Sequence, residues 1–406
     1  MRILFVHQSF PGQFVNLALQ LAKQPENQIV FLCEEKDQPQ IPNVLRATFK
    51  QTRFARKETH HYLRNAENAI LQGQAAYRTG LNLKQQGFEP DIVYGHAGFG
   101  AAMYMKDLYP KAPLVGYFEW FYHAHGGDVG FDPAIPVTAD DECRLRTKNM
   151  AILQELYSCD AGVTPTYWQH RQFPLEYRSK IHVLHDGVDT KMNRPDPQAK
   201  LVFAEQNLDL SEAQEIVTYV GRGMEEYRGF PQFMEAVSLL QKRRPQCHVV
   251  IVGGEGVSYG RPHPSGKSFK EILLKEYEYD LSRLHFTGPL PYAQYRQVLQ
   301  ASTVHVYLTY PFVLSWSMLE AMACGCTLVA SATPPVQEVV RDGENGLMVD
   351  FFNPQQLAAR LEEALADKEL RSRLGSNARE TIKSQYDVDR LVGQHLQLIQ
   401  NMAQKR

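Results

Sequence analysis

One short segment near residue 320 carries residue types in the order that an enzyme needs to bind a nucleoside diphosphate beside a sugar. Ser315, Trp316 and Ser317 begin a predicted helix. Glu320 lies one turn inside this helix, and Gly325 ends it. The backbone N–H groups at such a helix start can bind a phosphate. The segment therefore predicts a site for a nucleoside diphosphate.

Two arginines lie on one predicted strand-to-helix loop about a hundred residues earlier. Gly221 and Arg222 follow the end of a buried strand, and Arg228 comes just before the next helix. Guanidinium groups can hold phosphate oxygens with two parallel hydrogen bonds and stabilise a departing diphosphate. The alternative is that both are solvated loop arginines paired with Glu225 or Glu226.

Polar residues also follow the predicted strands of the first half. Gly12 lies in the first strand-to-helix loop, where a missing side chain lets a ligand phosphate approach the backbone. His96 ends a later strand, and Glu119 and His123 lie in the aromatic-rich segment 116–125. Aromatic faces beside carboxylate and imidazole groups suit a sugar. The alternative is a structural cluster in which the histidines only satisfy buried loop carbonyls.

Strands and helices alternate in two similar halves, which predicts two doubly wound α/β domains. The first is expected over residues 1–190, completed by a C-terminal helix over 386–406, and the second over 191–385. Between them, 186–206 is rich in Asp and Pro and is predicted to be a linker. The expected strands are Ile3–His7, Ile29–Cys33, Ile92–Gly95, Leu114–Phe118, Gly162–Thr164, His182–Leu184, Ile216–Val220, His248–Val252, Leu284–Phe286, Val304–Leu308 and Thr327–Ala330.

Length and charge narrow the class of protein further. A chain of 406 residues suits two domains of ordinary size, and a formal net charge of −2 gives no reason to expect nucleic acid. No apolar stretch has the length of a signal peptide core or a membrane span. We therefore expect a cytoplasmic protein with at most peripheral membrane contact, for which the small basic stretch 52–57 is a candidate.

The segment around Glu320 closely resembles the nucleotide-sugar site of the family 4 retaining glycosyltransferases. The family pattern is a Glu, seven residues, a second Glu, and then Ala-Met-Ala-x-Gly. Glu320 matches the second Glu and is followed by the matching run Ala321–Gly325, whereas Phe312 stands where the first Glu is expected. In the family that first Glu contacts the hydroxyls of the transferred sugar. Arg222 matches a family arginine, and Arg228 stands in for the usual lysine.

The resemblance implies a fold, a reaction and several further site residues. The fold would be GT-B, two Rossmann-like domains facing a central cleft. The reaction would be retaining transfer of a sugar from a nucleoside diphosphate sugar, with a UDP-sugar favoured, to a hydroxyl of a glycan, a lipid-linked sugar or a small molecule. No metal or other cofactor would be needed. Gly254 and Leu290 would line the nucleoside pocket, and Glu320 would accept hydrogen bonds from the ribose hydroxyls.

Three alternatives to these assignments remain. Glu320 could instead close a capping box with Ser317, three residues earlier. The same architecture also serves nucleotide-sugar epimerases and phosphorylases, because a fold does not fix chemistry. Phe312 at the place of a sugar-binding Glu is also compatible with a non-catalytic, sugar-binding partner subunit.

Overall fold

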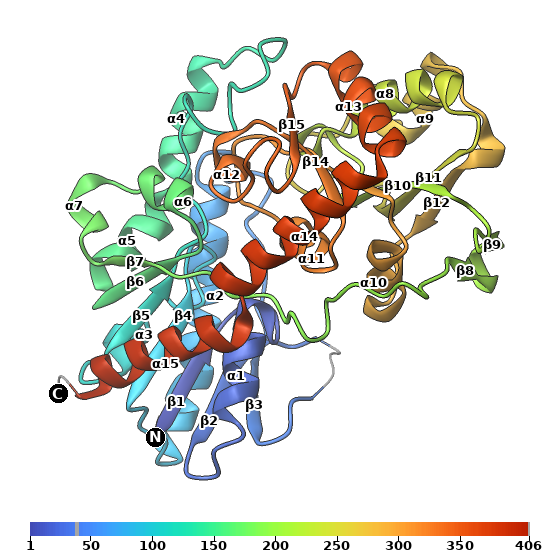
Figure 1. Cartoon of the computed structure of the whole chain (residues 1–406). Coiled ribbons are helices and arrows are strands. Elements are labelled where there is room, and N and C mark those ends of the chain that lie inside the picture. Colours follow the sequence, from blue (N-terminus) through green and yellow to red (C-terminus); the bar gives the residue numbers. More distant parts are fainter. Residues whose placement is uncertain (37–39, 405–406) are drawn as a thin grey trace. The chain divides into compact units, whose positions relative to one another are not determined.

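The chain folds into two compact α/β units (Figure 1). A computed structural model describes residues 1–36 and 40–404. The first unit comprises Met1–Gly187 together with the segment from Val388 onward, and the second comprises Val188–Asp387. Each unit is built on its own parallel sheet, so the predicted fold class of two Rossmann-like domains is confirmed.

The first sheet has seven parallel strands in the order β3-β2-β1-β4-β5-β6-β7. Its central strands are continuous apolar runs, as is typical of strands covered on both faces. In β1, residues Ile3 to Val6 are fully buried. The strands are β1 (Arg2–Val6), β2 (Gln28–Glu34), β3 (Val44–Phe49), β4 (Ile92–His96), β5 (Leu114–Tyr117), β6 (Ala161–Thr164) and β7 (Ile181–Val183).

Helices cover both faces of this sheet, and the last helix of the chain is one of them (Figure 1). Val392 and Ile399 of α15 (Val388–Gln404) are buried in the same cluster as Ile3 and Phe5 of β1. The helix predicted over 386–406 therefore packs on the first sheet, and residues 405–406 lie outside the described part. The other helices are α1 (Val15–Leu21), α2 (Arg64–Gln85), α3 (Met105–Leu108), α4 (Ala139–Lys148), α5 (Met150–Ser158), α6 (Tyr167–Gln172) and α7 (Leu175–Arg178).

The second sheet has six parallel strands in the order β12-β11-β10-β13-β14-β15. When the strands of each parallel sheet are numbered in chain order, both sheets run third, second, first, fourth, fifth, sixth, and the first sheet adds its seventh strand at the end. This is the doubly wound arrangement. The strand order reverses between β1 and β4 and between β10 and β13. Ligands bind such sheets at the carboxyl ends of the strands beside this reversal. The strands are β10 (Glu215–Gly223), β11 (Cys247–Gly254), β12 (Leu284–Gly288), β13 (Val304–Tyr307), β14 (Thr327–Ser331) and β15 (Leu347–Val349).

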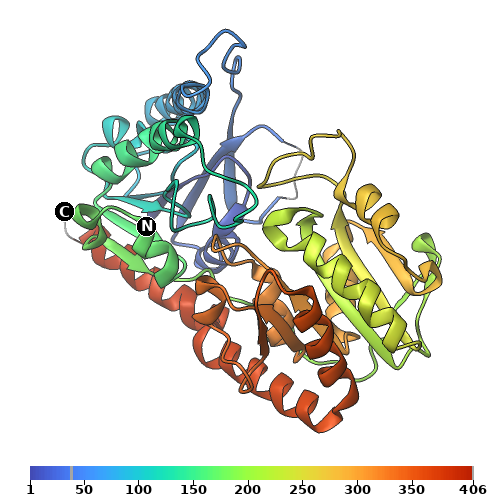
Figure 2. The ribbon, with the colours of Figure 1, turned by 90° about the horizontal axis from the view of Figure 1, so that it is seen from above.

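Amphipathic helices pack on the second sheet. The helix α8 (Phe230–Arg243) buries Phe233, Met234 and Val237 on one face, and it is the yellow-green helix lying over the strands in Figure 2. Within the described residues, no helix is long and apolar enough to cross a membrane. The remaining helices are α9 (Phe269–Glu276), α10 (Tyr292–Gln300), α11 (Trp316–Ala323), α12 (Pro334–Gln337), α13 (Pro354–Ala366) and α14 (Lys368–Gln385).

The predicted linker over 186–206 is only partly a connection. Leu201 and Phe203 are buried in a cluster of the second unit with Ile216 and Val250. Phe203 also belongs to a short antiparallel pair, β8 (Val202–Phe203) with β9 (Leu208–Asp209). The last residues of the predicted linker are therefore folded, because their few apolar side chains have a core to pack against.

Candidate functional site

Glu320 lies at the carboxyl edge of the second sheet and is held by two tyrosines. Its helix, α11, follows β13 directly along the chain. The Tyr292 hydroxyl donates to Glu320 Oε1 at 2.7 Å, and the Tyr295 hydroxyl donates to Oε2 at 2.6 Å. Neither tyrosine was identified from the sequence, because their proximity to Glu320 depends on how α10 and α11 pack.

The start of α11 is capped without Glu320. Ser315 is the N-cap residue, and its Oγ accepts a hydrogen bond from the backbone N–H of Ser317 at 3.3 Å. The two hydroxyls lie 2.9 Å apart. The capping box between Ser317 and Glu320 is therefore wrong, since the cap is two residues earlier and the carboxylate contacts tyrosines. Trp316, the first helical residue, is 40% exposed.

Arg228 is a buried cation at the same edge of the sheet. Only 6% of the residue is exposed, and Nη1 donates to the Tyr307 hydroxyl, Thr309 Oγ1 and the Val313 carbonyl at 2.9, 2.7 and 3.2 Å. Its guanidinium carbon also lies 5.1 Å from the centre of the Tyr259 ring. The side chain is thus fixed by the protein rather than solvated, which contradicts the solvated-loop alternative for this residue.

Arg222 has the opposite environment. It is exposed on β10, and none of the residues that the structure describes accepts a hydrogen bond from its guanidinium group. Glu225, one of the two predicted alternative partners, is fully buried and accepts hydrogen bonds from the backbone N–H groups of residues 258–260. The predicted pairing of the arginines with Glu225 is therefore wrong. Through these hydrogen bonds, Glu225 instead stabilises the loop that carries Tyr259.

The glycines at the ends of β10 and β11 allow close packing of the backbone. A Cβ on Gly253 would lie 1.8 Å from the Gly221 carbonyl oxygen, and one on Gly223 would lie 2.3 Å from the Gly256 oxygen. Gly254 pairs with Gly223 in the strand ladder. The glycine-rich pattern thus has a structural reason in addition to the predicted ligand role of Gly221 and Gly254.

Two further positions flagged by the sequence lie in apolar surroundings. Leu290 packs against the cluster that contains Val250 and Val298. Phe312 is 8% exposed, and its ring meets the rings of Tyr227 and Tyr259 edge-on at 5.8 and 5.5 Å. Phe312 therefore has the packing of an aromatic core residue where the family pattern has a sugar-binding carboxylate.

In the first unit, four polar side chains gather where β1, β4 and β5 end. The His7 Nε2 lies 2.7 Å from Gln13 Oε1, and Gln13 Nε2 donates to Glu119 Oε1 at 2.5 Å. The other oxygen of Glu119 lies 3.5 Å from His96 Nε2, and the His7 and His96 rings are 4.5 Å apart. The structure thus joins Glu119 and His96, both predicted, with His7 and Gln13, which the sequence analysis missed. The position of His7 and Gln13 at and just after the end of the first predicted strand was the sequence signal that could have identified them.

The hydrogen bonds fix the direction of this network. The backbone N–H of Ser9 donates to His7 Nδ1 at 2.8 Å, so Nε2 carries the proton and donates to Gln13. Burial, aided by the neighbouring His96, lowers the pKa of His7 to about 3, so that His7 is neutral. Burial alone would raise the pKa of Glu119, but His96 and Gln13 hold it below its usual value. The network therefore ends on an ionised carboxylate.

His96 is the unsatisfied member of this group. It is 2% exposed, and neither of its ring nitrogens has a hydrogen-bond partner among the described residues. The 3.5 Å separation from Glu119 is longer than an ordinary hydrogen bond. A buried polar group usually has a partner. The pair of His96 and Glu119 is therefore a candidate for binding a hydroxyl.

Gly12 and His123 have structural explanations in the same unit. Gly12 has a φ of +53°, and a Cβ there would lie 2.6 Å from the His7 ring, so glycine leaves room for that ring. His123 Nε2 donates to the backbone carbonyl of Gln172 at 2.7 Å. That bond is the carbonyl-satisfying role that the sequence left open for the histidines.

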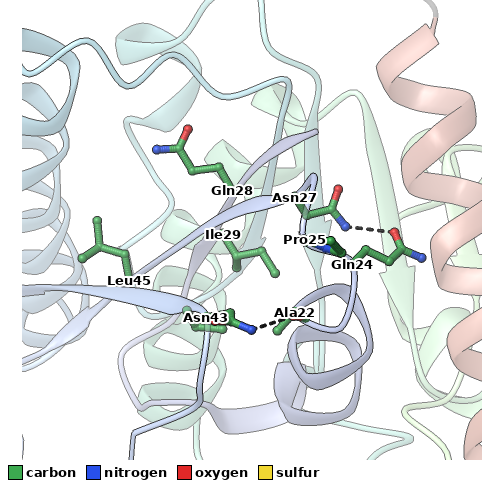
Figure 3. A pocket seen from close by; sticks show the side chains of 9 residues that line it. Ala22, Gln24, Pro25, Asn27, Gln28, Ile29, Asn43 and Leu45 are labelled. Carbon is green, nitrogen blue, oxygen red and sulfur yellow. Dashed lines mark hydrogen bonds between the residues drawn. The ribbon is translucent and has the colours of Figure 1, made fainter.

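A hollow of about 510 Å³ in the first unit lies away from these residues (Figure 3). It is lined by residues at the starts of β2 and β3, including Gln28, Ile29 and Val44. Figure 3 shows Asn27 bonded to Gln24 and Asn43 bonded to Ala22 beside it. The hollow therefore lies at the amino ends of the parallel strands, opposite the edge that carries His7 and Glu119.

Two family models match consecutive parts of the chain. Residues 25–192 match the glycosyl transferase family 4 group, and residues 203–381 match the glycosyl transferases group 1. A D-inositol 3-phosphate glycosyltransferase of Corynebacterium aurimucosum is 25% identical over 59% of this chain and 57% of its own length. One from Mycolicibacterium vanbaalenii is 29% identical over 53% of this chain and 47% of its own length. The chain thus spans about half the length of the curated relatives it matches.

Solved structures share the fold over the whole chain. Sucrose-phosphate synthase from Thermosynechococcus elongatus superposes with a TM-score of 0.72 at 18% identity, covering all of both chains. HepE from Anabaena, in complex with UDP-glucose, gives a TM-score of 0.72 at 16% identity, covering 99% of this chain and all of that one. At such identities these likenesses establish the fold alone. The two family models together show that the chain belongs to the family 4 type of glycosyltransferases, and the solved structures show that its fold is GT-B.

Proposed function

We propose that the chain is a retaining glycosyltransferase that moves a sugar from a nucleoside diphosphate sugar to a hydroxyl of an acceptor, without a metal or other cofactor. The observation that carries this proposal is the grouping at the reversal point of the second sheet. Arg222 lies on β10, and α11 with Glu320 follows the adjacent strand β13. Cation, helix N-terminus and carboxylate are the groups that a diphosphate joined to a ribose requires.

The chemistry assigned to these groups is stabilisation of the leaving diphosphate. The bond between the anomeric carbon and the diphosphate oxygen breaks, and the acceptor oxygen bonds to that carbon on the same face. The acceptor proton passes to the departing phosphate oxygen. Arg222 and the N–H groups at the start of α11 offset the negative charge that develops on the diphosphate. Arg228, already bonded to Tyr307 and Thr309, contributes its fixed positive charge.

The first unit supplies the groups proposed to bind a sugar or acceptor hydroxyl. An O–H group would donate to the ionised Glu119, and its oxygen would accept a hydrogen bond from His96 Nε2, the ring nitrogen nearest that carboxylate. We propose a UDP-sugar as the donor, which is supported by the UDP-glucose complex of HepE. The proposed acceptor is a glycan, a lipid-linked sugar or a small polyol. The inositol phosphate named for the corynebacterial relative supports a hydroxyl-rich acceptor.

The proposal is tested by mass spectrometry of reactions with a panel of nucleotide sugars and sugar acceptors, with and without EDTA. We expect an acceptor heavier by one sugar, formed equally with the chelator. An isomerised donor with no consumption of acceptor would establish an epimerase instead. No product from any donor, together with sugar binding, would favour the non-catalytic subunit suggested by the buried Phe312.

A further inference from the structure

We propose that Tyr292 and Tyr295 are positioning residues that fix the Glu320 carboxylate for the two ribose hydroxyls of a ribonucleoside diphosphate. This inference rests on the proposed function, since it takes Glu320 as the residue that recognises the nucleoside. It adds that recognition depends on two tyrosine hydroxyls from the neighbouring helix. The ligand class it specifies is ribonucleotides in preference to 2′-deoxyribonucleotides.

The two tyrosines bind opposite oxygens of one carboxylate. They are three residues apart on α10, so they lie on the same face of that helix. Tyr292 donates to Oε1 at 2.7 Å and Tyr295 to Oε2 at 2.6 Å, with ring centres 5.6 Å apart. Such a pair restrains rotation of the carboxylate, because turning it would break both hydrogen bonds.

The count of acceptor sites leaves room for a ribose. An ionised carboxylate has about four lone-pair sites, two on each oxygen. The tyrosines occupy one site on Oε1 and one on Oε2. One site remains on each oxygen. Two neighbouring hydroxyls such as the 2′ and 3′ groups of ribose match the two remaining sites in number.

Tyr292 is itself held in place. The Asn193 side-chain amide donates to the Tyr292 hydroxyl at 3.0 Å, while that hydroxyl is closer to Glu320 than to Asn193 Oδ1, at 2.7 against 3.3 Å. The phenol proton is therefore directed to Glu320. Burial, followed by the charge of Glu320, raises the pKa of Tyr295 well above its ordinary value. The same two causes raise the pKa of Tyr292, so both tyrosines remain protonated donors at neutral pH.

Capping of its own helix does not explain why two tyrosines hold Glu320. The start of α11 is capped by Ser315, so the carboxylate is not needed there. The hydrogen bonds do connect α10 with α11, which is the competing structural role. The experiment must therefore measure ligand discrimination and stability separately.

The test is calorimetric titration with matched ribo- and 2′-deoxyribonucleoside diphosphates, starting with UDP and dUDP and then the other bases. The wild type is expected to prefer the ribonucleotide. Tyr295→Phe and Tyr292→Phe should each weaken binding of the ribonucleotide about tenfold, as expected for loss of one hydrogen bond to a charged group. Binding of the deoxy compound should change less, so the preference should shrink. Glu320→Gln combined with Tyr295→Phe should lose little more than Glu320→Gln alone.

Tyr277→Phe is the matched control. Its hydroxyl donates to the Glu235 carboxylate at 3.2 Å in the same unit, so the variant loses the same kind of bond away from Glu320. It should leave the Kd for both nucleotides unchanged. Thermal unfolding of each variant reports the structural role, and the half-exposed Tyr292 gives a second variant if Tyr295→Phe folds poorly.

Two outcomes separate this inference from the proposed function. If the wild type binds a ribonucleotide tightly but the tyrosine variants keep its preference over the deoxy compound, the positioning role is overturned while the function stands. If the wild type binds no nucleoside diphosphate of any base, the proposed function is overturned and this inference falls with it.

Discussion

Replacing Arg222 by Ala removes an exposed cation that has no hydrogen-bond acceptor among the described residues. Exposed side chains of this kind usually change the free energy of unfolding by no more than about 0.5 kcal/mol. The variant should therefore fold like the wild type. Any loss of activity would then belong to the reaction rather than to the structure.

The expected loss is large. Removing one preorganised donor to a developing anion commonly costs on the order of 2.7–4 kcal/mol in the activation barrier. At about 1.36 kcal/mol for each factor of ten, this corresponds to a hundredfold or greater fall in turnover. Arg228→Ala should reduce turnover similarly, but the double variant should fall by less than the product of the two, because both cations serve one diphosphate.

The assay is the initial rate of nucleoside diphosphate release at saturating donor, with the melting temperature measured on the same samples. Arg341→Ala is the control, since Arg341 is an exposed arginine of the same unit whose 3.6 Å ion pair with Glu344 lies at the surface. It should keep both rate and stability. If Arg222→Ala turns over like the wild type with saturating donor, the diphosphate does not bind at this loop.

Three further predictions follow from burial. Arg228→Ala removes the hydrogen bonds from Nη1 to Thr309, the Val313 carbonyl and the Tyr307 hydroxyl, of which only the last keeps another donor, the Ser315 N–H. The variant should lower the free energy of unfolding by about 3 kcal/mol, as urea denaturation would show. Arg228→Lys keeps three N–H donors and should retain much of the stability and of the turnover measured in rate assays. Phe312→Glu places a carboxylate in an aromatic cluster and should lower the free energy of unfolding by roughly 2–4 kcal/mol without raising turnover. A large gain of activity would show that the natural protein is a degenerate enzyme. Burial raises the pKa of Glu155 to about 8, above its unfolded value. The contribution of Glu155 to the free energy of unfolding is therefore full below pH 4.5 and is lost as the pH rises through 8. Glu155→Gln should gain stability relative to the wild type between about pH 5 and 8, and parallel curves of stability against pH would refute this.

The central strands of both sheets could be predicted because buried parallel strands are continuous apolar runs. The elements that the sequence analysis missed lack that signal. The buried residues of the long helix α2 are mostly small or polar, with Leu83 as the large apolar side chain among them, so no strong apolar period marks it. They are Ala69, Gln72, Gly73, Ala76, Gly80 and Leu83. The helix α14 likewise buries only Leu374, Gly375, Ala378 and Ile382.

The residues of the candidate site were likewise only partly predictable from the sequence. Glu320 and Arg222 could be named because a local motif and a strand-to-helix loop mark them. The partners of the site residues could not, since they are distant in the chain. Gln13 meets Glu119 across 106 residues, and Tyr295 meets Glu320 across 25. Glu225 was taken as a possible ion-pair partner because the sequence does not show that it lies buried against the backbone of residues 258–260.

The proposed reaction transfers a sugar from a nucleoside diphosphate sugar with retained configuration and without a metal. Time-resolved proton NMR of the anomeric signals, in a reaction of the protein with UDP-glucose or another accepted donor, a hydroxyl acceptor and EDTA, tests it most directly. We expect a new anomeric signal of the same configuration as the donor, growing in step with the nucleoside diphosphate and absent without acceptor. A product of inverted configuration, or a donor that isomerises without acceptor, would contradict it.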